Sequence, residues 1–165
     1  MGRIQERSRA MDVNLINPFI ESFTETLPQI GFQSVIRTNL AVVNNILRFS
    51  GVLVNISLIG QYKGASLIGM DITSAKSFAS KMMMGMPVAE FDELAQSAVS
   101  EMGNMVCAGA CSRFSTIGIK GLDISPPTLL MVTDGVAKLP VPQAIAISYV
   151  ADDIPINMYV GITAQ

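Results

Sequence analysis

The chain has 165 residues, of which 50% are hydrophobic and 15% are charged, with a formal net charge of −2 and no histidine. The absence of histidine excludes a Ser-His-Asp or Cys-His nucleophile pair, the common zinc ligand sets and a phosphorylated histidine, and the slightly acidic balance argues against a nucleic-acid-binding protein. The length and apolar content are sufficient for one domain with its own core.

The N-terminal residues are charged. Arg3, Arg7 and Arg9 make this end basic, but the apolar segment of a signal peptide does not follow them. The sequence also lacks an unbroken run of about 18 apolar residues, so we expect no transmembrane helix and a cytoplasmic location. We predict that residues 1–11 form a flexible leader and that residues 12–165 form a single domain.

The first half of the domain is predicted to contain one helix followed by strands. Apolar residues at helical spacing predict a helix from Asp12 to Leu27, ended by Pro28 and Gly31. Runs rich in Val, Ile and Leu, with a hairpin at 60–64, predict strands over residues 33–43, 51–59 and 65–71.

The second half begins with two predicted helices. The first covers residues 74–84, with Thr73 or Ser74 as its N-cap, and the second is a long helix from about Ala89 to Phe114. Strands are predicted over 122–124, 128–133, 144–150 and 155–162, with turns at 134–135 and 151–153. Strands mixed with separated helices predict an α+β domain, in which a mainly antiparallel sheet packs against long helices.

The predicted long helix has two unlike sides. With Glu101 set at zero and about 100° per residue, Leu94 and the other apolar residues fall between roughly 20° and 160°. Ser97, Asn104 and other polar residues fall between roughly −20° and −140°. We therefore predict that Ser97, Glu101 and Asn104 share the outward face of this helix.

Two other pairs of residues are predicted to be structural. Cys107 and Cys111 fall on the polar side, where their spacing on one helix is poor for a disulfide. We expect reduced thiols, buried against a neighbouring segment or a second subunit rather than used in redox control. Asp152 and Asp153 are interpreted as turn acids rather than as a metal site.

Charge is unevenly distributed along the long helix. The interval between Lys81 and Arg113 contains no basic residue. Its acidic residues are Glu90, Asp92, Glu93 and Glu101. This pattern is compatible with an ordinary solvated helix face and with a face that meets a cationic site on a partner.

The segment from Ser97 to Asn104, followed by Pro127, resembles the signature of the CheC/CheX/FliY family of chemotaxis phosphatases. That signature is Asp or Ser, three residues, Glu, two residues, Asn, twenty-two residues and Pro, and Ser97, Glu101, Asn104 and Pro127 match every position. CheC-like members carry two such motifs, whereas this chain carries one. A single motif favours the CheX branch or a CheC-like form that has lost one site, and the resemblance implies a CheC/CheX-like fold.

The resemblance implies a phosphorylated receiver domain such as CheY as substrate, with the receiver's Mg²⁺ and lysine beside its aspartyl phosphate. This chain is expected to bind no metal or cofactor. Asn104 would position the attacking water and Glu101 would pair with the receiver's lysine. Ser97 is either a partner contact or a plain surface serine, and Pro127 is expected to shape a loop. A homodimer with paired sheet edges is also implied.

Two functions remain open at this point. The first is hydrolysis of the aspartyl phosphate of a response regulator in chemotaxis or another two-component pathway. The second is a non-catalytic scaffold of the same fold that docks a receiver domain or a flagellar-switch component. The intact pair of Glu101 and Asn104 favours the phosphatase, because a protein that only binds has no need of the amide.

Overall fold

The computed structural model describes residues 13–164, so the expected leader at residues 1–11 lies outside the described residues. The helical elements are η1 (Val13–Leu15), α2 (Asn17–Gln29), α3 (Ile72–Met82) and α4 (Glu93–Thr116). The strands are β1 (Val35–Ile59), β2 (Tyr62–Met70), β3 (Asp123–Ile124), β4 (Thr128–Ala151) and β5 (Ile154–Ala164). The first predicted helix therefore begins later than expected, because η1 precedes α2.

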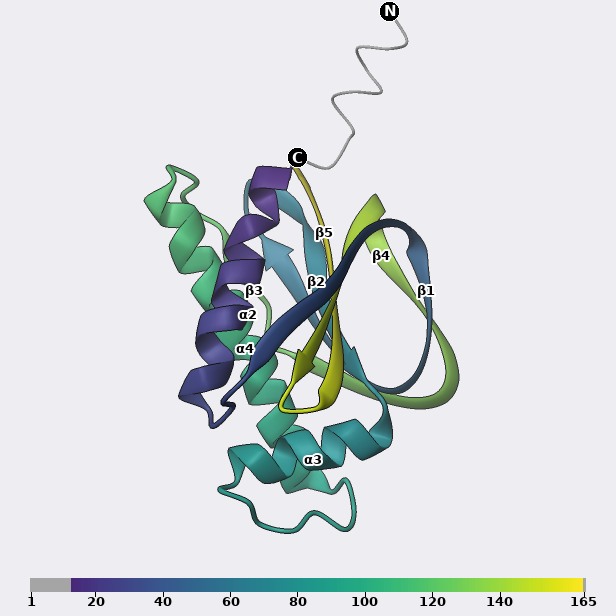
Figure 1. Ribbon diagram of the computed structural model, residues 1–165. Helices are drawn as coiled ribbons and strands as arrows, with labels where there is room; N and C mark the ends of the chain where they lie inside the picture. Colours follow the sequence, from purple (N-terminus) through teal and green to yellow (C-terminus); the bar gives the residue numbers. More distant parts are fainter. Residues whose placement is uncertain (1–12, 165) are drawn as a thin grey trace, which may run out of the picture.

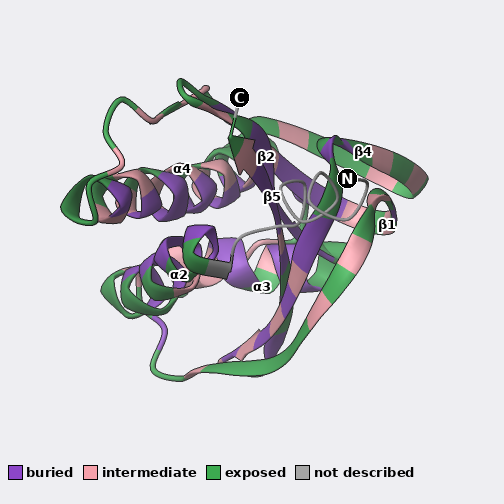
Figure 2. Ribbon diagram, turned by 90° about the horizontal axis from the view of Figure 1, so that it is seen from above, coloured by how far each residue is buried: buried purple, intermediate pink, exposed green. Residues whose placement is uncertain are grey.

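The helices cover one face of an antiparallel sheet, and α2 and α4 lie side by side on it (Figures 1 and 2). The strand order is β2-β5-β4-β1-β3, and β1 also pairs with β2. Aromatic residues of the helices form much of the core between the layers: Phe23 stacks on Tyr149 of β4, and Phe19 meets Phe114 edge to face. This arrangement confirms the predicted α+β class with a mainly antiparallel sheet.

The strands β1 and β4 are longer than predicted. The segments predicted as separate strands over 33–43 and 51–59 belong to one strand, and the turn predicted at Asp134-Gly135 is wrong, since Gly135 pairs with Phe49. The register between β1 and β4 shifts at 37/39, 44/46 and 49/51, and the last of these shifts lies at Gly51. Backbone pairing along the two strands therefore overrides the weak local tendency to turn.

The paired strands β1 and β4 curl so that a second, smaller core lies behind the sheet. The end of β1 pairs with β2, while its beginning pairs with the end of β4, which pairs with β5. The middle of this ribbon arches over the face opposite the helices (Figure 2). The second core contains Leu47, Leu53, Ala65, Leu67, Leu139, Val141 and Ala144.

Two aspartates fix where the helices beside the site begin. The carboxylate of Asp71 accepts a hydrogen bond from the Ser74 amide at 2.7 Å, so the predicted N-cap at Thr73 or Ser74 is wrong. Asp92 accepts one from the Ala95 amide at 3.0 Å, so α4 begins after Asp92 rather than near residue 89. In both cases the carboxylate satisfies an amide that the first turn leaves without a backbone partner.

The β4–β5 turn is clamped to the start of β1. Asp152 accepts hydrogen bonds from the amides of Gln33 and Ser34 and from Lys81 Nζ at 2.5 Å. The Lys81 ammonium, together with the two amides, lowers the pKa of the Asp152 carboxyl. Asp152 and Asp153 have positive φ values of 45° and 68°, as in a tight turn. These are therefore turn acids, as expected from the sequence.

Candidate functional site

The helix α4 carries the predicted site and packs on both the sheet and α2. Its buried residues are Ala95, Val99, Met102, Gly103, Val106, Cys107, Ala110 and Phe114. On the helical wheel this arc is centred near 170° from Glu101, which places Glu101 in the middle of the exposed arc. The predicted buried arc was rotated by about 80°, so Leu94, which was assigned to the buried side, is exposed. Cys107 lies within the observed buried arc and is buried, as expected, although the helical wheel had placed it on the polar side.

A glycine between the two candidate catalytic residues lets α4 approach the sheet. Gly103 is buried, and a Cβ atom added there would lie only 2.8 Å from Cγ1 of Val54 on β1. Real Cβ atoms do not make contacts this short, so the backbone of α4 at this level lies closer to β1 than any other residue would allow. The positions of Glu101 and Asn104 therefore depend directly on this contact.

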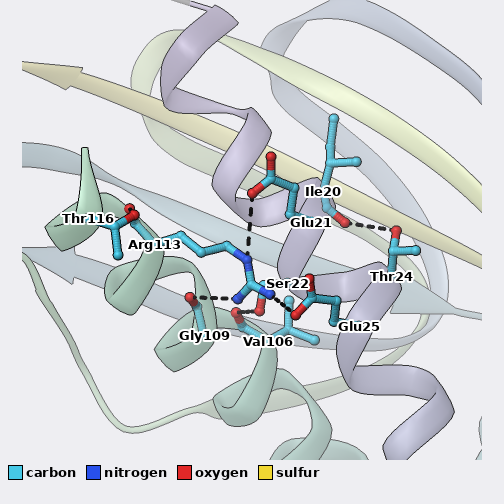
Figure 3. A network of polar contacts seen from close by, with 9 residues as sticks. All are labelled: Ile20, Glu21, Ser22, Thr24, Glu25, Val106, Gly109, Arg113 and Thr116. Carbon is cyan, nitrogen blue, oxygen red and sulfur yellow. Dashed lines mark hydrogen bonds and ion pairs between the residues drawn. The ribbon is translucent and has the colours of Figure 1, made fainter.

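A polar network holds the C-terminal half of α4 against α2 (Figure 3). Ser22 is buried and its hydroxyl donates a 2.6 Å hydrogen bond to the Val106 carbonyl. Arg113 forms ion pairs with both Glu21 and Glu25 of α2 and donates to the Gly109 carbonyl at 3.0 Å. These contacts fix the helix on a second side and leave its opposite side open to solvent.

The structure brings three of the four predicted site residues to that open side. Ser97 and Glu101 are exposed and Asn104 is half-buried, all within two turns of α4. Within residues 13–164, none of these three side chains takes part in a hydrogen bond or an ion pair. A carboxylate and an amide held on a rigid helix with unused hydrogen-bonding groups are available to a partner.

Pro127, the fourth predicted residue, lies on a different element. It is half-buried and immediately precedes β4, in the connection from β3. This connection is fixed to β1 by two hydrogen bonds between Ser125 and Ser57, both of 2.9 Å. The structure therefore places Pro127 in a loop held against the sheet, which is compatible with the predicted loop-shaping role.

The acidic character of the helix surface persists in the folded structure. Glu90, Asp92, Glu93 and Glu101 are exposed. The flanking basic residues are engaged elsewhere, since Lys81 pairs with Asp152 and Arg113 pairs with α2. Among the described ion pairs, none neutralises these four carboxylates, so the N-terminal half of α4 presents net negative charge.

The cysteines are free thiols within the packed structure. Burial raises the pKa of Cys107 to about 12 and also raises that of Cys111. Both thiols are therefore poor nucleophiles, which agrees with the predicted structural role.

In the part of the chain that is described, no group of three or more His, Cys, Asp or Glu residues is arranged to hold a metal ion. None of the described helices is long and apolar enough to span a membrane.

The fold and the exposed carboxylate-amide pair define a domain of the chemotaxis phosphatase type. The family model for chemotaxis phosphatase CheX matches residues 52–148, more than half of the chain. The chain therefore belongs to the CheX family.

A curated relative agrees with this assignment, and solved structures share the fold. The "CheY-P phosphatase CheX" of Thermotoga maritima is 29% identical over 131 residues, which cover 75% of this chain and 79% of the relative. A CheC-like superfamily protein from Shewanella sp. PV-4 has a TM-score of 0.81 at 22% identity, covering 93% of this chain and 100% of that one. The structure of a CheX-CheY-BeF3-Mg complex from Borrelia burgdorferi has a TM-score of 0.74 at 20% identity, covering 90% and 97%.

One feature of the helix surface escaped the sequence reasoning. Leu94 is 61% exposed and lies on the same side of α4 as Glu101, although hydropathy assigned it to the buried side. The signal that could have found it was Asp92, a residue typical of N-caps. A helix beginning after Asp92 places Leu94 in the first turn, at the end of α4 where fewer neighbours cover it.

Proposed function

We propose that this protein hydrolyses the aspartyl phosphate of a CheY-like receiver domain, with Asn104 orienting the attacking water and Glu101 pairing with the receiver's lysine. The observation that carries the proposal is that both side chains project from the open side of α4, one turn apart, without a partner among the described residues. Membership of the CheX family, a relative named CheY-P phosphatase and a CheX structure in complex with CheY support it.

The chemistry requires positioning more than a strong base. Water attacks phosphorus in line with the acyl oxygen, the P–O bond to the aspartyl group breaks, and inorganic phosphate and a free carboxylate result. The amide oxygen of Asn104 can accept a hydrogen bond from the water while its NH₂ group donates to a phosphoryl oxygen. The Mg²⁺ held by the receiver would neutralise charge on the phosphoryl oxygens, so this chain needs no metal of its own.

Glu101 has a different role in the proposal. A carboxylate that meets the receiver's lysine forms a charge-assisted hydrogen bond, which fixes the register of α4 on the receiver and places Asn104 over the phosphorus. Ser97, one turn earlier, is small enough to let the receiver approach and contributes a hydroxyl to the contact. Pro127 acts only through the shape of its loop.

Substitution of the amide tests the proposal most directly. Asn104→Ala should keep receiver binding within about twofold and lower the acceleration of phosphate release by about 100-fold or more. Glu101→Ala should weaken both binding and rate. The assay is phosphate release from a Mg²⁺-bound phosphorylated receiver domain, with Ser112→Ala on the exposed C-terminal part of α4 as a matched control.

The same assay separates the two functions left open by the sequence. A scaffold would bind the phosphorylated receiver without accelerating release, and Asn104→Ala would then leave the rate unchanged. If wild-type protein and Asn104→Ala accelerate release equally, the assigned mechanism is wrong. The proposed location is the cytoplasm, where two-component receiver domains are found.

We also propose that the protein is a homodimer formed by pairing of sheet edges. Residues 35–43 of β1 pair with β4 on one side, and no other described strand pairs with this half of β1. Its exposed apolar side chains include Leu40 and Val42, which is 62% exposed. An open edge strand with exposed apolar side chains is a template for pairing with another strand, and natural monomers usually protect such edges.

A single charged substitution on this edge strand tests the proposed dimer. Val42→Lys should convert the dimer into a monomer, because the lysine would be buried against the second copy. Ile117→Lys, at the exposed C-cap of α4, should leave the dimer intact and serves as the control. Light scattering gives the mass of each variant. A monomeric wild-type protein at tens of micromolar, or a dimeric Val42→Lys, would contradict the proposal.

A further inference from the structure

The open side of α4 continues beyond the candidate catalytic pair as a single ridge. Leu94, Ser97, Glu101, Asn104 and Ala108 follow one another at intervals of three and four residues, which places them along one side of the helix. Four of the five are exposed and Asn104 is half-buried. At 1.5 Å per residue the ridge is about 21 Å long, a length that suits contact with another small domain.

Leu94 is a large apolar residue that is exposed on this ridge. Among the described residues, it is neither part of the main core nor one of the partly buried residues packed against that core. Its neighbours Asp92 and Glu93 are acidic and exposed. Leu94 lies about 10 Å along the helix from Glu101 and about 20° around it, so a partner that reaches Glu101 also reaches Leu94.

We propose that Leu94 is an apolar anchor for the receiver domain and a determinant of which receiver this protein accepts. This inference rests on the proposed function. The fitting partner has a cationic group for Glu101 and, about 10 Å away, an apolar depression for Leu94. The unneutralised carboxylates at the start of α4 favour a receiver with positive charge around that depression. Small residues, Ser97 and Ala108, flank the pair and allow close approach of the partner backbone.

The expected effect of removing the anchor is on binding and not on chemistry. Leu94→Gln keeps good helix propensity and loses the apolar contact, so the Kd and KM for the receiver should rise about tenfold while kcat stays within about twofold. Leu94→Met, which retains an apolar side chain, should restore most of the affinity. Ile117→Gln is the matched control, because Ile117 is similarly exposed, at 57%, but lies at the other end of α4.

Binding is measured with the receiver domain in Mg²⁺ and beryllofluoride, a phosphoryl mimic that is not turned over, and kinetics are measured with the phosphorylated receiver. If wild type binds the mimic but does not accelerate phosphate release, the proposed function fails while the anchor is still tested by the Kd. Equal Kd values for wild type and Leu94→Gln would overturn the inference. So would a lower kcat at unchanged KM, or loss of the dimer in light scattering, which would assign Leu94 to the contact between two copies.

Discussion

Substitution of Gly103 by alanine tests whether the close contact between α4 and β1 sets the position of the candidate catalytic pair. Two opposing terms decide the outcome. Alanine gains about 0.5–1 kcal/mol over glycine in the middle of a helix. The new Cβ, however, would lie 2.8 Å from Val54 Cγ1 and 3.4 Å from Ile56 Cδ1. Val54 is buried and β-branched, so it moves little, and overpacking of this kind costs about 1–3 kcal/mol.

The net expectation is that Gly103→Ala lowers the free energy of unfolding by about 1 kcal/mol. With a slope of about 2 kcal/mol per molar urea, the midpoint of urea unfolding falls by about 0.5 M. Because α4 must move outward, kcat for receiver dephosphorylation should fall more than receiver binding does. The second substitution Val54→Ala makes room for the new methyl group. Val54→Ala should therefore lower the free energy of unfolding less in the Gly103→Ala protein than in the wild-type protein. A Gly103→Ala protein that is more stable than wild type would show that the contact is not limiting and refute the reasoning.

Two further substitutions test contacts that hold the fold, and a pH profile tests the role of Asn104. Asp152→Asn should lower the thermal midpoint above about pH 5, and its difference from the wild-type midpoint should shrink below about pH 4. The reason is that the pKa of the Asp152 carboxyl is lowered in the folded protein. A lowered pKa stabilises the fold at higher pH, and this stabilisation is lost as the pH falls through the folded-state pKa. Ser22→Ala removes the 2.6 Å hydrogen bond to the Val106 carbonyl and should cost about 1 kcal/mol in urea unfolding. The ratio of kcat between wild type and Asn104→Ala should stay constant from pH 6 to 9, because an amide does not titrate; a ratio that changes tenfold would indicate a titrating base instead.

The class of fold could be predicted from the sequence because its apolar runs and helical periodicities mark the individual elements. The continuity of β1 could not. Around Gly51 the chain reads as a break, and only the ladder with β4, which lies more than 75 residues further along the chain, holds it extended. The same long-range pairing keeps Gly135 in a strand. Local propensity is a weak predictor where pairing between distant segments satisfies the backbone.

The candidate site was predictable for a different reason. Ser97, Glu101 and Asn104 are close in sequence, so helical geometry alone brings them to one side of α4. The direction of that side was predicted less well, because α4 buries Gly103 and Cys107 beside its apolar residues and leaves Leu94 exposed. Hydropathy does not distinguish a glycine that faces a strand from one that faces solvent. Close packing, which decides the orientation, becomes visible only in the folded structure.

The lack of histidine is consistent with how this site is built. Neither cysteine offers a base near neutral pH, since burial raises the pKa of both thiols. What the chain offers instead is a carboxylate and an amide whose positions are fixed by a glycine contact on one side of α4 and by the Ser22 and Arg113 network on the other. In the proposed mechanism a receiver with its own lysine and Mg²⁺ would supply the charges, and this protein would contribute the precise placement of one water. Such a site gains more from a rigid helix than from a titratable side chain.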